Sequence, residues 1–191
     1  VVGHNGETQV LAGPVAFNVK RLRTGALPSA PLDEIERFNT ELNDLYGQTA
    51  AVRYTIRDAR QQLDRLTTML ARMSRPLASG SRRIHAMRVE LFEIEEIVFG
   101  VDVQDGIGGY GPMSVSSWLG HARRGVSNSS YGPTASHRQS VDHARSVFEP
   151  VKAQLNELVD VALPTLKREM QAAGAPWTVG QAIEGNALES N

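Results

Sequence analysis

The stretch Ile35–Met73, IERFNTELNDLYGQTAAVRYTIRDARQQLDRLTTMLARM, decides the fold of this chain. Within it, apolar residues recur at alternating steps of three and four, and Thr49 is the only polar member of the series. This spacing places the series on one helix face, which must be buried against a partner helix. At 1.5 Å per residue, the helix spans roughly 58 Å and forms the spine of the protein. The series comprises Ile35, Phe38, Leu42, Leu45, Thr49, Val52, Ile56, Ala59, Leu63, Leu66, Leu70 and Met73.

A shorter helix is predicted near residues 81–99, where the same spacing recurs. Gly100 is placed to cap its end, and Phe92 and Ile97 are expected to widen its apolar face. The connection from the long helix is short, so the two helices are expected to run antiparallel. The stripe consists of Ile84, Met87, Leu91, Ile94 and Val98.

Two further helices are predicted in the second half of the chain. Residues 112–127 fit a short helix within an irregular, glycine- and serine-rich region. Residues 133–173 fit a second long helix, in which Pro150 and Pro164 are each expected to cause a bend. Its stripe consists of Val141, Ala144, Phe148, Val151, Leu155, Leu158 and Ala162. The sequence therefore predicts a mainly α protein, an antiparallel helical bundle of two long and one or two shorter helices.

The first residues follow a different pattern. Asn5-Gly6 is a hairpin turn signal, and period-two apolar residues predict short strands near 7–11 and 15–21. This short N-terminal β-hairpin either packs on the bundle or is the stub of an upstream β-sandwich, and we favour the stub. Because the chain begins without a methionine or a signal peptide, we expect a processed product or a fragment. The expected divisions are the hairpin (1–22), a linker (23–31), the bundle (32–178) and a flexible tail (179–191).

The composition argues against several classes of function. With 20 basic and 21 acidic residues the net charge is −1, which gives no electrostatic case for binding nucleic acid or an anionic membrane. No apolar run approaches the roughly 18 residues of a membrane-spanning helix. Cysteine is absent, so disulfides and thiolate metal sites are excluded.

Three patterns resemble functional motifs but lack a required part. The string Gly106–Gly111 matches G-x-G-x-x-G, yet a helix precedes it where a dinucleotide-binding turn needs a strand. Asp102 and Asp105 suggest a calcium loop, but valines occupy the neighbouring ligand positions. None of the five histidines follows a Glu or Asp by three residues, as a di-iron bundle requires. We therefore expect no cofactor, no metal and no catalytic residue.

An acidic patch on the helix at 81–99 is formed by Glu90, Glu93, Glu95 and Glu96. Such a run is most often a solvated face, and the alternative is a docking surface for a basic partner. We select candidate partner contacts from this patch and from the aromatic residues outside the stripes. They are Glu90, Glu93, Glu96, Tyr110, Trp118 and Trp177.

Three strings along the chain also stand together: GPVAFNVK at 13–20, SSYGPTASH at 129–137, and Leu163-Pro164 followed by AGAPW at 173–177. In this order they resemble the C-terminal region of large secreted bacterial proteins with a sortilin-like repeat propeller, often labelled glycosyl hydrolases. The resemblance covers roughly 7–178. It implies a periplasmic or extracellular location and an upstream propeller and β-sandwich. The family's ligand-binding residues would lie in that propeller, so no catalytic residue carries over.

Two functions remain as hypotheses. We expect a non-catalytic structural or protein-interaction module, an accessory subunit that docks on a larger extracytoplasmic or membrane-associated assembly. Its partner is then another protein or a multi-subunit complex, and any membrane contact is made through that partner. The alternative is the accessory C-terminal domain of a secreted glycan-acting hydrolase. The heptads also permit self-association, because spacing does not distinguish seams within a chain from seams between chains.

Overall fold

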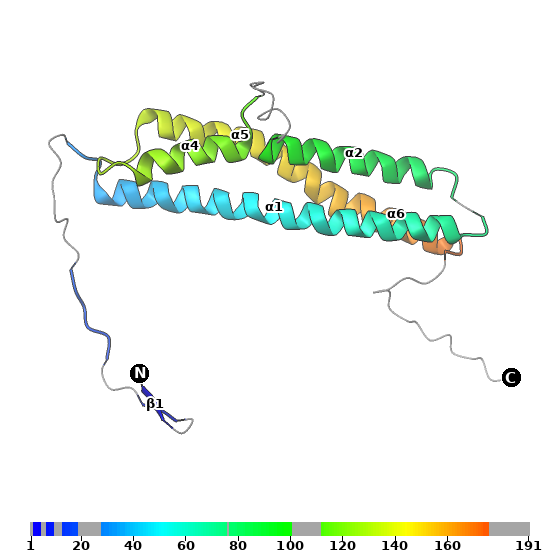
Figure 1. The fold of residues 1–191 in the computed structure, drawn as a ribbon, viewed down its shortest axis with the longest axis horizontal. Coiled ribbons are helices and arrows are strands. Elements are labelled where there is room, and N and C mark those ends of the chain that lie inside the picture. Colours follow the sequence, from blue (N-terminus) through cyan, green and yellow to red (C-terminus); the bar gives the residue numbers. More distant parts are fainter. Residues whose placement is uncertain are drawn as a thin grey trace.

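The computed structural model describes residues 28–75, 77–100 and 112–175, the segment 13–18, and the backbone of 2–4 and 7–9. In these residues the protein is mainly helical, and its helices pack into an elongated bundle (Figure 1), which confirms the predicted class of fold. No helix of this part of the chain is both long and apolar enough to cross a membrane. The helices are α1 (Leu32–Arg72), α2 (Gly80–Phe99), α4 (Val115–Ser127), α5 (Ala135–Glu157), η1 (Leu158–Ala162) and α6 (Leu163–Ala172).

The long helix α1 buries the stripe that predicted it. Eleven of its twelve members are buried, Thr49 among them, and Ile35 is half-buried at the start of the helix. The Thr49 hydroxyl donates to the Leu45 carbonyl at 2.8 Å, so the one polar member leaves no unpaired group in the core. The seam is therefore filled by the chain's own helices. A Cβ added at Gly47 would meet no neighbouring atom within 4 Å, so this glycine is a tolerated weakness of the helix and not a close contact.

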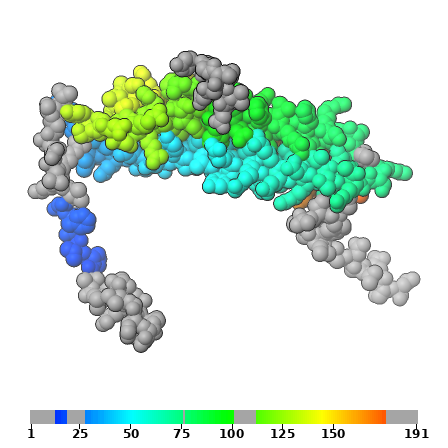
Figure 2. Space-filling view, viewed as in Figure 1, coloured from blue at the N-terminus to red at the C-terminus, as the bar shows by residue number. Residues whose placement is uncertain are grey.

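The helices form three rods. The first rod is α1. Beside it, helices α2 and α4 lie end to end as a second rod, and the continuous segment α5–η1–α6 forms the third (Figure 1). Figure 2 shows α4 and α2 following one another above α1. The prediction of antiparallel packing is right for α1 and α2 but wrong for the two long helices, which run in the same direction. The reason is that two short helices in series bring the chain back to the start of α1 before α5 begins.

The third rod differs from its prediction at one turn. Its predicted stripe is buried up to Leu158, but Ala162 is only half-buried, and the next buried residue is Leu163. The five-residue step is absorbed by η1, a π turn in which the Leu163 N–H bonds the Leu158 carbonyl. A π turn takes one residue more than an α turn and so returns Leu163 to the core. Pro164, which cannot donate a backbone bond, follows immediately.

Three helix ends carry capping features, of which Gly100 was predicted. Gly100 follows α2 with φ of 84°, and the Thr134 hydroxyl accepts from the N–H of His137 at the start of α5. Beyond α6, Gly174 has φ of 79°, which favours glycine. Its N–H bonds the Gln171 carbonyl, while the next N–H bonds the Met170 carbonyl. This is the Schellman pattern of a helix C-terminus.

The N-terminal segment contains two short strands. The backbones of β1 (Val2–His4) and β2 (Glu7–Gln9) pair antiparallel, with Gly3 opposite Thr8. The predicted strand at 15–21 is not found at 15–18, which have no regular secondary structure and are exposed. The tail at 179–191 lies outside the described residues. The packing of the hairpin and the division into domains stay predictions.

Candidate functional site

The seam between α1 and α5 pairs its polar side chains in a regular ladder. Each rung joins residues 104 positions apart, and successive rungs are seven positions apart on both helices. A constant offset requires two parallel helices, and this is the e/g pairing of a parallel coiled coil. The rungs are Arg138–Glu34, Arg145–Glu41 and Lys152–Gln48. The hydrogen bond that Arg145 donates to Glu41 raises the pKa of the Arg145 guanidinium above its ordinary value.

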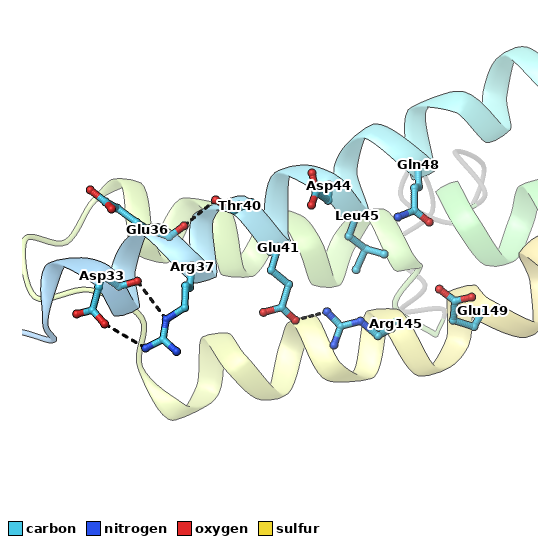
Figure 3. A pocket seen from close by; sticks show the side chains of 10 residues that line it. All are labelled: Asp33, Glu36, Arg37, Thr40, Glu41, Asp44, Leu45, Gln48, Arg145 and Glu149. Carbon is cyan, nitrogen blue, oxygen red and sulfur yellow. Dashed lines mark hydrogen bonds and ion pairs between the residues drawn. The ribbon is translucent and has the colours of Figure 1, made fainter.

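An open groove of about 680 Å³ runs beside this seam (Figure 3). Its two arginines are already paired, Arg145 with Glu41 and Arg37 with Asp33 at 3.3 Å. Nowhere in the described part of the chain do three metal-ligating side chains gather into a site for an ion. The groove is therefore the solvated, acidic side of the seam. Its lining comprises Asp33, Glu36, Arg37, Thr40, Glu41, Asp44, Leu45, Gln48, Arg145 and Glu149.

The outer face of α2 has a different character. The predicted stripe of α2 is buried, but the expectation that Phe92 and Ile97 widen it is wrong, because Phe92 is 54% and Ile97 39% exposed. Val89, at 42% exposed, lies one turn from Phe92. The helix turns about 100° per residue, which carries these positions past the edge of the core. We name Val89, Phe92, Ile97, Glu90, Glu93 and Glu96 the outer face of α2.

The carboxylates of this face have no cation among the described residues to balance them. Glu90, Glu93 and Glu96 form no ion pair with any described residue, and no Lys or Arg stands three or four positions from any of them. Glu95, by contrast, accepts from Arg60 of α1 at 2.6 Å. Partial burial, and then the charge of Glu93, raise the pKa of Glu90 above its ordinary value. The structure therefore brings three of the predicted contact residues together with exposed apolar side chains.

The remaining predicted contact residues do not join this face. Trp118 of α4 is half-buried and packs edge-on against the ring of His143 in α5, with ring centroids 4.8 Å apart. It therefore serves the α4–α5 contact. Tyr110 and Trp177 lie outside the described residues, as do the glycine-rich string and the two aspartates weighed as a calcium loop.

A group of titratable side chains at the α4–α5 corner was not foreseen. His137 Nδ1 accepts from the Thr134 N–H at 3.2 Å and so completes the capping box of α5. Its ring lies over Gly125, where an added Cβ would come within 2.0 Å of Nε2, and 5.8 Å from the His121 ring. Burial, and then the charge of His121, lower the pKa of His137. A histidine three residues after a threonine cap was the available sequence signal.

Comparison with known proteins adds no relative. The chain matches no protein-family model, and no curated protein or solved structure matches it significantly. The resemblance to the helical region of sortilin-like propeller proteins therefore stays a hypothesis.

Proposed function

We propose that this protein is a non-catalytic structural and interaction module that docks on another protein through the outer face of α2. The observation that carries the proposal is the combination on one helix of exposed apolar side chains and carboxylates that form no ion pair with a described residue. A partner that buries apolar side chains gains about 25 cal/mol of binding free energy for each Å² of apolar surface removed from water. Phe92, at 54% exposed, is the largest of them.

The charges of this face indicate the chemistry of the partner. Glu90 and Glu93 repel one another, and Glu96 lies one turn beyond on the same helix. A partner that presents lysines or arginines around an apolar centre relieves this repulsion and covers Phe92 at the same time. An amphipathic helix with basic flanks meets both requirements.

The wider setting follows from the sequence resemblance. We infer an accessory subunit of a larger extracytoplasmic or membrane-associated assembly, in the periplasm or outside a bacterial cell. The strings at 13–20, 129–137 and 173–177 also favour a second candidate, the accessory C-terminal domain of a secreted glycan-acting hydrolase. In that case the partner surface lies on an upstream part of the same polypeptide. Peptides from an upstream propeller in the native protein would select this candidate.

The test uses a synthetic probe, a 21-residue helical peptide with one leucine face flanked by lysines. We expect saturable binding, measured by fluorescence anisotropy, that weakens about tenfold or more in Phe92→Asp, because a buried phenylalanine contributes roughly 1.5–3 kcal/mol. The matched control is Val161→Asp, which alters an exposed apolar residue of η1. Equal weakening by both substitutions, or equal binding of a leucine–glutamate peptide, would contradict the proposal.

The charges are tested separately. Replacing Glu90, Glu93 and Glu96 by glutamine should weaken the lysine peptide several-fold and reduce its salt dependence. The control E36Q/D44N/E157Q removes the same charge from exposed sites elsewhere and should leave binding unchanged. If the control weakens binding as much, the attraction arises from net charge and the α2 face is not the site.

A further inference from the structure

A second groove, of about 510 Å³, lies between α1 and α2 and carries the opposite charge balance to the outer face of α2. Two arginines at this groove, one in its lining and one beside it, are neutralised. Arg60 bonds Glu95 at 2.6 Å, and Arg88, beside the groove, bonds Asp64 of its lining at 2.7 Å. The full lining is Arg53, Tyr54, Ile56, Arg57, Arg60, Gln61, Asp64 and Glu95.

Two further guanidiniums in this groove have no carboxylate among the described residues. Arg53 and Arg57 stand one helical turn apart on α1, and like charges at this spacing repel. Each is held by an aromatic ring instead. The Arg53 Cζ lies 4.1 Å from the Phe99 ring centroid, and the Arg57 Cζ lies 5.1 Å from the Tyr54 ring centroid. The rings position both cations without cancelling their charge.

We propose that this groove binds the phosphate group of a small phosphorylated molecule between Arg53 and Arg57. A phosphate monoester carries nearly two negative charges near neutral pH, which matches two unpaired guanidiniums. The planar donors of arginine bind phosphate oxygens in pairs, and a bound dianion removes the repulsion between the two side chains. Tyr54, 62% exposed at the groove, offers an aromatic surface and a phenolic donor to the body of the ligand.

This site is independent of the proposed docking face. It uses the α1 side of the α1–α2 contact, whereas the docking face uses outward residues of α2. The volume lies within the range of roughly 300–1,000 Å³ that is usual for small-molecule sites. Because the whole chain has a net charge of −1, the two cations form a local site and not part of a basic nucleic-acid surface.

The test is a titration of the ¹⁵N-labelled protein with phenyl phosphate and, separately, with inorganic phosphate. We expect saturable shifts of the Arg53, Tyr54 and Arg57 amides with phenyl phosphate, and at least tenfold weaker binding in R53Q and in R57Q. The matched control R65Q removes one exposed arginine of α1 outside the groove and should bind as the wild type does.

The two ligands separate the sources of binding. Saturation with both ligands supports recognition of the phosphate itself, and tighter binding of phenyl phosphate supports the part assigned to Tyr54. Linear, non-saturating shifts with both ligands would overturn the proposal, as would equal losses in R57Q and R65Q. The double variant R53K/R57K keeps both charges, so undiminished affinity in it would overturn paired recognition by guanidinium. Circular dichroism of each variant shows whether its helices are intact.

Discussion

The α1–α5 seam and the outer face of α2 carry similar kinds of side chain in different circumstances. At the seam, Glu34 and Glu41 each have an arginine of α5 at a fixed offset of 104 residues. On α2, Glu93 has no such partner in the part of the chain that the structure describes, and Phe92 is exposed beside it. Where charges are matched within the chain they align two helices. Where they are unmatched beside apolar surface, they are available to another molecule.

The largest expected effect contrasts the same residue type on the two sides of the bundle. Phe148→Ala removes a fully buried ring from α5 and should lower the free energy of unfolding by about 3–5 kcal/mol. Phe92→Ala removes an exposed ring and should change it by less than about 0.5 kcal/mol. Chemical denaturation of both variants measures the difference. Similar losses in the two would show that Phe92 belongs to the core.

A second contrast uses two helical glycines. Gly125→Ala places a methyl group where the His137 ring lies, and should destabilise the protein by about 1–3 kcal/mol through overpacking. Gly47→Ala has open space around it and should stabilise the protein by about 0.5–1 kcal/mol. Thermal and urea unfolding would report the opposite signs. A stabilising Gly125→Ala would refute the packing of His137 against α4.

A third prediction concerns pH at the α4–α5 corner. The folded pKa of His137 is lower than the ordinary 6.5, so the unfolded chain binds more protons just below that pH. The stability that this group contributes is fully present above pH 6.5. It is lost as the pH falls through the window between 6.5 and the lower folded pKa of His137. Protonation also removes the Nδ1 acceptor for Thr134 and places a cation, beside His121, at a helix N-terminus.

Two variants of His137 separate these effects. His137→Ala should lose about 0.5–2 kcal/mol of stability above the window, because the capping contact is gone. His137→Glu keeps a capping-box residue at this position and should lose the decline of stability that begins as pH falls below 6.5. Urea unfolding across this range measures both. An unchanged pH profile in His137→Glu would assign the decline to other groups.

The smallest expected effect is at the seam itself. Arg145→Gln breaks a pair whose side chains are both about two-fifths exposed, so solvent screens it, and the loss should be about 0.2–1 kcal/mol. Glu93→Gln should bring no loss and a slight gain, since it removes repulsion with Glu90. The loss of unfolding free energy in Arg145→Gln should be smaller at high salt than at low salt, because salt screens the pair. A loss that does not depend on salt would mean that Arg145 acts through packing.

Much of the fold was predictable because apolar residues at alternating steps of three and four identify the buried face of a helix. The stripes of α1 and α2 identified most of their buried residues, and Gly100 marked the end of α2. Ala162 was misplaced because a π turn is set by packing around Leu163 and Pro164, which spacing does not reveal. The parallel direction of the long helices had a signal, the heptad spacing of charges at 34, 41 and 48 against 138, 145 and 152.

The candidate site was predictable only in part. The carboxylates Glu90, Glu93 and Glu96 stood out as a run, but their apolar neighbours did not. The spacing alone does not show whether Phe92 is buried beside the α2 stripe or exposed outside it. The positions of α1 and the third rod show that it is exposed. Arg53 and Arg57 gave no motif, since their role depends on rings that the fold brings to them.

Site-specific photo-crosslinking from position 92 in the protein's native host tests the outer face of α2 as a docking surface. The same cross-linker at position 65, exposed on α1, is the control. We expect position 92 alone to capture one partner segment, apolar with a net positive charge, and E90Q/E93Q/E96Q to reduce its capture several-fold. Equal capture from both positions, or capture of an acidic segment, would contradict the claim that the outer face of α2 is a docking surface.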